Sequence, residues 1–209
     1  MKLNWANRLT ILRILMIPLF VWLLYTSTPV IWNQTVYLSY IWAIIVFMLA
    51  SITDWLDGFI ARKFNMITDL GKFLDPLADK ILVISALVCF INVFWIPAWA
   101  VIVIIAREFI VTGFRLAVVE KNKEAVIAAD IWGKIKTAFT MVAIIAILVL
   151  HTFFDWFKFN FLNLQTWGEN RCYALTVYTV CDILIYICAA LTVFSGVTMI
   201  WKNRKLFTQ

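Results

Sequence analysis

Four aspartates in one short stretch are the residues most able to do chemistry. Asp54 and Asp57 are three residues apart, and Asp75 and Asp79 are four residues apart. Side chains at these separations share one face of a helix, so each pair would present two carboxylates on the same side. If the two faces met, the like charges would repel each other unless cations neutralised them. Carboxylate oxygens at this density suit two divalent ions, Mg²⁺ or Mn²⁺, and paired metals stabilise displacement at phosphorus.

The elements that must position these carboxylates are long apolar segments. Apolar residues make up 64% of the 209 positions and charged residues 14%, whereas soluble domains average roughly 45–50% and 25%. Six apolar stretches approach or exceed the roughly 20 residues with which a helix crosses a bilayer; they span residues 9–25, 36–53, 73–92, 94–118, 126–152 and 173–201. Backbone groups in hydrocarbon must pair within their own segment, which favours helices. We therefore expect an all-α polytopic membrane protein, a single domain over residues 1–209, with about six transmembrane helices after a short N-terminal interfacial segment.

Basic residues predict the orientation of these helices. Most of the 18 Lys and Arg residues lie in or near the termini and the connections after the second and fourth apolar segments, and only Lys158 and Arg171 lie in the connection after the fifth. Cytoplasmic loops carry the Lys/Arg excess, so we expect a multi-pass protein of the plasma membrane whose acidic site faces the cytoplasm. The net charge of +6 indicates attraction to anionic membrane lipids. Nucleic acid is not an expected partner, because no soluble basic domain is present to bind it.

Small and basic residues surround the aspartates. Gly58 and Gly71 leave room where a substrate or a neighbouring helix approaches closely. Arg62 lies four residues after Gly58 on the same predicted helix and could pair with a phosphate or with Asp57. Any one aspartate alone would fit a helix cap or an ion pair, but eight specified residues at fixed offsets are hard to attribute to coincidence.

The spacing resembles the signature of the CDP-alcohol phosphatidyltransferases. That signature is D-x2-D-G-x2-A-R-x8-G-x3-D-x3-D, and residues 54–79 match it at every fixed position. The resemblance covers nearly the whole chain and implies a homodimer with a polar cavity open to the cytoplasm. It also implies that Asp54, Asp57 and Asp75 bind metal. By the same resemblance Asp79 is both a metal ligand and the general base that deprotonates the acceptor hydroxyl.

The start of the chain is similar to the same family. Asn7-Arg-Leu-Thr10-Ile-Leu-Arg13 looks like the family's N-x-L-T-x-x-R segment, which lies near the bound nucleotide. The resemblance implies contacts with the CDP-lipid from Asn7, Thr10, Gly58, Arg62 and Thr68. From the residues alone, Asn7 and Thr10 also fit a plain helix start, and a threonine such as Thr68 is common in loops.

Basic residues in the later apolar segments bear on the second substrate. Arg107 and Arg115 interrupt the fourth segment, and Lys134 and Lys136 interrupt the start of the fifth. Several cations near one cavity favour an acceptor that carries phosphate, because arginine binds phosphate in a bidentate way. The two lysines point about 200° apart on a helix, so at most one faces the cavity. The other would extend to the headgroups, and for the lysines as a pair membrane orientation explains the charge equally well.

The identity of the acceptor rests on likeness to one branch of the family. Arg107-Glu-Phe-Ile-Val-Thr-Gly-Phe-Arg115, with Gly133-Lys-Ile-Lys-Thr137 after it, resembles the phosphatidylglycerophosphate synthase branch. This implies CDP-diacylglycerol as donor, sn-glycerol 3-phosphate as acceptor, and phosphatidylglycerophosphate and CMP as products. Serine, an inositol phosphate or phosphatidylglycerol are alternative acceptors. An ion-coupled transporter would also use buried carboxylates, but here they cluster toward one membrane face without an internal repeat.

Overall fold

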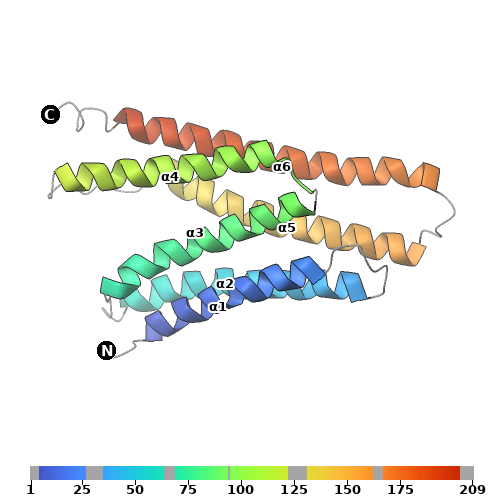
Figure 1. Ribbon diagram of the computed structural model, residues 1–209, viewed down its shortest axis with the longest axis horizontal. Coiled ribbons are helices and arrows are strands. Elements are labelled where there is room, and N and C mark those ends of the chain that lie inside the picture. Colours follow the sequence, from blue (N-terminus) through green and yellow to red (C-terminus); the bar gives the residue numbers. More distant parts are fainter. Residues whose placement is uncertain are drawn as a thin grey trace. The chain divides into compact units, whose positions relative to one another are not determined.

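Helices form nearly all of the part of the chain that the structure, a computed structural model, describes. The backbone is described for residues 5–26, 35–63, 69–93, 95–121, 131–161 and 167–202. Within these, side chains are described for residues 10–26, 38–53, 77–93, 95–114, 117, 131–154, 156 and 175–202. The helices are α1 (Trp5–Thr26), α2 (Thr35–Lys63), α3 (Asp69–Asn92), α4 (Ala98–Lys121), α5 (Ile131–Phe161) and α6 (Trp167–Lys202) (Figure 1). No strand occurs in these ranges, which confirms the all-α prediction.

The helix ends differ from the predicted apolar segments where the sequence turns polar. α1 begins at Trp5, so the short segment expected at the membrane interface is continuous with the first helix. α2 continues to Lys63 and α3 begins at Asp69, which places all four signature aspartates inside helices. α5 runs on to Phe161, beyond the predicted end of its apolar segment. Hydropathy indicates only the part of a helix that can lie in hydrocarbon. The helix itself continues beyond that part wherever its backbone hydrogen bonds continue.

Two helices are long and apolar enough to cross a bilayer, judged over the described residues. They are Ile131–Phe154 within α5 and Leu175–Lys202 within α6. Shorter apolar helices cover Thr10–Thr26 and Leu38–Thr53. Large apolar side chains such as Ile102 are also exposed on the outward faces of the helices. Helices that are apolar on all sides fit surroundings of lipid, and the number of six spans stays a prediction.

The chain divides into two compact units, and α5 and α6 contribute to both. One unit comprises Met1–Val93 and Ile144–Val177, and the other comprises Phe94–Ala143 and Tyr178–Gln209. In the first unit α1 packs against α2 and α3, and α2 contacts α3. α2 runs toward the end of this unit from which α3 returns, and the start of α1 lies at that same end (Figure 1).

Aromatic and small side chains hold the first unit together. Phe20 of α1 meets Phe47 of α2 with ring centroids 5.5 Å apart, and both are fully buried. Ala78, Leu82 and Ala86 of α3 recur every four residues and are also fully buried. Small side chains such as Ala78 and Ala86 let neighbouring helix backbones approach closely, so this face of α3 packs against the rest of the unit.

In the second unit, α4 lies against α6 and α6 against the first part of α5. Trp99 of α4 stacks on Tyr186 of α6 with ring centroids 5.1 Å apart. Trp132 of α5 meets Phe194 of α6 edge to face at 5.0 Å. These aromatic pairs fix the rotation of the three helices, and a group of charged and hydroxyl side chains lies among them.

Candidate active site

The four signature aspartates lie near the adjoining ends of α2 and α3. Asp57 precedes the end of α2 and Asp75 follows the start of α3 by about 9 Å each, at 1.5 Å per residue. Asp54 and Asp79 are about 13 to 15 Å from those same ends. The chain runs in opposite directions along the two helices, so both extend to the same side of their connection (Figure 1). Each aspartate of α2 therefore has a counterpart on α3 at a similar level along the helix.

This donor set fits hard divalent cations. Four carboxylates in two pairs match the oxygen ligands and charge that Mg²⁺ or Mn²⁺ requires. Asp79 is partly buried, and the side chains of Asp54, Asp57 and Asp75 lie outside the described part of the chain. Among the side chains that are described, no group of three or more His, Cys, Asp or Glu residues converges. The assignment of the four aspartates as metal ligands therefore stays a prediction, and their positions in α2 and α3 are compatible with it.

The first turns of α1 bring two polar residues to the same end of this unit. Thr10 and Arg13 are both fully buried and lie one turn apart on the helix. The start of α1 lies at the end of this unit where α2 ends and α3 begins, so its first turns, which hold these residues, lie toward the aspartates (Figure 1). The other predicted nucleotide contacts fall outside the described side chains: Asn7, Gly58, Arg62 and Thr68.

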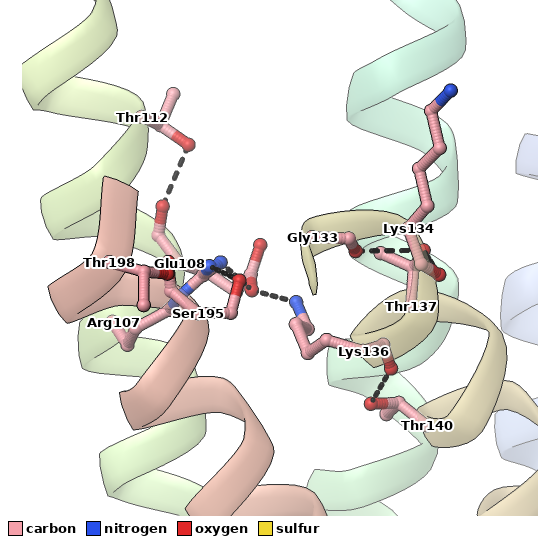
Figure 2. A network of polar contacts seen from close by, with 10 residues as sticks. All are labelled: Arg107, Glu108, Thr112, Gly133, Lys134, Lys136, Thr137, Thr140, Ser195 and Thr198. Carbon is pink, nitrogen blue, oxygen red and sulfur yellow. Dashed lines mark hydrogen bonds and ion pairs between the residues drawn. The ribbon is translucent and has the colours of Figure 1, made fainter. Parts of the chain in front are cut away.

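In the second unit, charged side chains of α4 and α5 converge on one carboxylate (Figure 2). Arg107 Nη1 donates a hydrogen bond to Glu108 Oε1 at 3.0 Å, and Lys136 Nζ forms an ion pair with the same oxygen. Their side chains are only 12% (Arg107), 17% (Glu108) and 6% (Lys136) exposed. Among the side chains that the structure describes here, two cations and one anion give a net charge of +1 in a shielded place. Such a surplus favours binding of an anion.

α6 supplies two residues to this cluster that the sequence analysis missed. Ser195 Oγ accepts a hydrogen bond from Arg107 Nη2 at 2.6 Å. A Cβ on Gly196 would lie 3.0 Å from Arg107 Cγ, so the arginine stem runs directly against this glycine. The signal available in the sequence was a serine followed by a glycine within an apolar helix, because small residues are typical of close helix contacts. Glu108 was also not among the predicted binding residues.

The four predicted acceptor residues have different positions. The structure brings Arg107 and Lys136 together through Glu108. Lys134 is exposed whereas Lys136 is 5% exposed, as their angular separation on the helix predicts. Thr140 Oγ1 donates to the Lys136 carbonyl at 2.8 Å. The side chain of Arg115 lies outside the described residues.

The sequence likeness to known proteins spans both groups of residues. A sequence model of the CDP-alcohol phosphatidyltransferases matches residues 3–193. The chain belongs to this family. The matched range holds the four aspartates of α2 and α3 as well as Arg107 and Lys136, whereas Ser195 lies two residues beyond it. The CDP-alcohol phosphatidyltransferase family consists of enzymes, which argues against the ion-coupled transporter.

Relatives with one shared name are similar to this chain. A Bacillus subtilis (strain 168) protein named CDP-diacylglycerol–glycerol-3-phosphate 3-phosphatidyltransferase is 41% identical over 170 residues, covering 78% of this chain and 86% of the relative. A Haemophilus influenzae protein of the same name is 35% identical over 201 residues, which cover 93% of this chain and 90% of the relative. The Escherichia coli (strain K12) protein of that name is 38% identical over 146 residues, which cover 69% of this chain and 76% of the relative. In each comparison the similarity therefore extends over most of this chain and most of the relative.

Proposed function

We propose that this CDP-alcohol phosphatidyltransferase moves the phosphatidyl group of CDP-diacylglycerol to sn-glycerol 3-phosphate, forming phosphatidylglycerophosphate and CMP. The relatives from Bacillus subtilis and Haemophilus influenzae are named for this reaction. In this chain the choice of acceptor rests on one observation: two shielded cations, Arg107 and Lys136, both contact Glu108. Their excess positive charge favours the binding of an anion.

The charge of this cluster separates the acceptor classes. Phosphate can receive hydrogen bonds from both terminal nitrogens of an arginine and from a lysine at once. Serine carries no phosphate to engage these groups. An inositol phosphate carries the same group as glycerol 3-phosphate, so the cluster supports both, and the names of the relatives favour glycerol 3-phosphate.

The signature aspartates are proposed to hold the metals. Asp54, Asp57, Asp75 and Asp79 would bind two divalent cations, Mg²⁺ or Mn²⁺, at the adjoining ends of α2 and α3. When bound, these cations would supply charge stabilisation at the pyrophosphate of the donor. The two-and-two distribution of carboxylates on opposite helices supports a pair of ions.

The chain's own residues would then perform one displacement. Asp79 accepts the proton of the acceptor hydroxyl, a role worth about 10² to 10⁴ in rate for a general base. The hydroxyl oxygen forms a bond to the phosphorus that bears the diacylglycerol, and the bond from that phosphorus to the oxygen of CMP breaks. Arg107 and Lys136 keep the acceptor's own phosphate in place, which supplies orientation. No covalent intermediate with the enzyme is needed.

Further residues are proposed as substrate contacts by family likeness. Thr10 is buried in the first turns of α1, and α1 begins at the end of the first unit where α2 and α3 adjoin, which supports a role at the CDP-lipid (Figure 1). The other candidates for that lipid are Asn7, Gly58, Arg62 and Thr68. Arg115 remains a candidate for the acceptor phosphate. Lys134 is exposed, which suits lipid headgroups better than a shielded phosphate.

The proposed setting is the plasma membrane. We expect a homodimer of single-domain chains, each with about six spans and an active site that faces the cytoplasm. The two long apolar helices and the exposed apolar faces support immersion in lipid. The distribution of Lys and Arg along the sequence supports the orientation.

Release of CMP by the purified protein tests the function. CDP-diacylglycerol in detergent would be supplied with Mg²⁺ or Mn²⁺ and, in separate reactions, with glycerol 3-phosphate, inositol phosphate, serine or phosphatidylglycerol. We expect release with glycerol 3-phosphate and only background with the others. Release with serine alone would overturn the acceptor and keep the reaction class. No release with any acceptor would overturn the proposed function.

A further inference from the structure

Arg107 is anchored at both terminal nitrogens, and only one of the two anchors is charged. Nη1 donates to the Glu108 carboxylate at 3.0 Å, and Nη2 donates to the Ser195 hydroxyl at 2.6 Å (Figure 2). Ser195 is 88 residues further along the chain, on α6, and is 2% exposed. A planar guanidinium with both terminal nitrogens anchored has its plane fixed, because it cannot rotate without breaking a hydrogen bond.

Gly196 leaves the space that the stem of Arg107 occupies. A Cβ at this position would lie 3.0 Å from Arg107 Cγ and 3.1 Å from Arg107 Nε. Real side chains do not tolerate such contacts without a shift in close-packed surroundings. Cγ belongs to the stem and Nε is part of the guanidinium itself, so a shift at either atom moves the charged group. A methyl group at this position would therefore push Arg107 by a few tenths of an ångström.

The anchored guanidinium still has donors for a ligand. Each terminal nitrogen carries two hydrogens, and the contacts to Glu108 and Ser195 use one on each. Lys136 reaches the same carboxylate oxygen as Arg107, so the two cations lie close together. Whether both can engage one phosphate then depends on the orientation of the guanidinium relative to the ammonium group.

We propose that Ser195 and Gly196 are positioning residues for the acceptor phosphate. Together they form the α6 seat, which holds the Arg107 guanidinium in the orientation that lets it act with Lys136. The inference rests on the proposed function, in which these two cations bind the phosphate of the acceptor. Neither seat residue needs to touch the acceptor, because each acts through Arg107.

Two substitutions in the α6 seat and one control test the proposal. Gly196→Ala adds a methyl group against Arg107, and Ser195→Ala removes one hydrogen-bond acceptor. The matched control is Gly113→Ala on α4, where an added Cβ meets nothing within 4 Å. Initial rates of CMP release would be measured while glycerol 3-phosphate and CDP-diacylglycerol are varied separately.

The expected result is a selective loss of acceptor affinity. Gly196→Ala should raise the KM for glycerol 3-phosphate about tenfold or more. Ser195→Ala should raise it about 3- to 10-fold, because the hydrogen bond that it loses acts on the acceptor only through Arg107. In both seat variants the KM for CDP-diacylglycerol should stay within about twofold of the wild-type value. In the control Gly113→Ala the KM values for both substrates should stay within the same limit. A merely structural defect would reduce the number of active molecules and lower kcat without a selective change in one KM.

Two further measurements sharpen the comparison. Ser195→Thr keeps a hydroxyl at the same position and should retain most of the acceptor affinity lost in Ser195→Ala. Inorganic phosphate, a probe without the glycerol moiety, should inhibit the wild type competitively with glycerol 3-phosphate and inhibit Gly196→Ala more weakly. Both effects require a phosphate held through Arg107.

The variants separate failure of the α6 seat from failure of the proposed function. If Arg107→Ala raises the KM for the acceptor while Gly196→Ala and Ser195→Ala do not, the seat is wrong and the proposed function stands. If Arg107→Ala leaves that KM unchanged, the acceptor-phosphate role itself is wrong. Should Gly196→Ala fail to fold, Ser195→Ala decides alone, because it removes a single oxygen atom and adds no bulk.

Discussion

Lys136 of α5 forms an ion pair with the carboxylate of Glu108 on α4, 28 positions earlier in the chain. Lys134, two residues before Lys136, is exposed and lies outside this pair. The two lysines therefore offer a natural comparison of a shielded and a solvated cation on one helix.

Replacing the shielded lysine should weaken acceptor binding far more than replacing the exposed one. Lys136→Ala should raise the KM for glycerol 3-phosphate by about tenfold or more, because a charged donor in a shielded place is worth on the order of 1.5–3 kcal/mol. Lys134→Ala should change it by less than about twofold, since exposed charges contribute little. Rates of CMP release against acceptor concentration would measure both. Equal effects of the two substitutions would contradict this assignment.

Removing the negative charge at Glu108 should strengthen anion binding. Glu108→Gln keeps an oxygen that accepts hydrogen bonds from Arg107 and Lys136 but raises the summed charge of these three side chains from +1 to +2. Inorganic phosphate should then inhibit CMP release at concentrations about 3- to 10-fold lower, which corresponds to roughly 1 kcal/mol. The gain should shrink as ionic strength rises. Weaker inhibition would mean that the carboxylate is needed to hold the cations in place.

Helical periodicity allowed much of this arrangement to be predicted. The angle between Lys134 and Lys136 separates one shielded lysine from one exposed lysine, and that difference is observed. The spacing of the aspartates likewise predicts two faces on neighbouring helices. α2 and α3 carry the aspartates near their adjoining ends, and the meeting of the two faces stays a prediction. Both inferences needed only the geometry of a single helix and its nearest neighbour in sequence.

The contact between Arg107 and Ser195 could not be predicted in this way. It joins α4 to α6 across 88 residues and depends on how far each helix is rotated about its axis. That rotation follows from side-chain packing, such as the stacking of Trp99 on Tyr186. A serine in an apolar helix is also compatible with a hydrogen bond to its own backbone. Its partner therefore emerges only from the packed structure.

The buried aromatic pair of the first unit should contribute strongly to stability. Phe47→Ala leaves Phe20 facing a cavity, and a buried phenylalanine replaced by alanine costs about 3–5 kcal/mol. The matched control is Phe109→Ala, because Phe109 is 67% exposed on α4 and its loss leaves no cavity. Thermal inactivation in detergent should show a much lower midpoint for Phe47→Ala alone. Similar midpoints for the two variants would mean that the Phe20 and Phe47 contact is dispensable.

Asp79 is predicted to carry the chemical step, whereas Asp69 at the start of the same helix is not part of the signature. Asp79→Asn removes the base that accepts the hydroxyl proton, so kcat should fall about 10²-fold or more at saturating substrates. Asp69→Asn should retain activity within about twofold. CMP release at increasing Mg²⁺ or Mn²⁺ would distinguish the two proposed roles of Asp79. A variant that recovers full rate at high metal has lost only a ligand, whereas one that stays slow has lost the base. Full turnover of Asp79→Asn at ordinary metal concentration would exclude both roles.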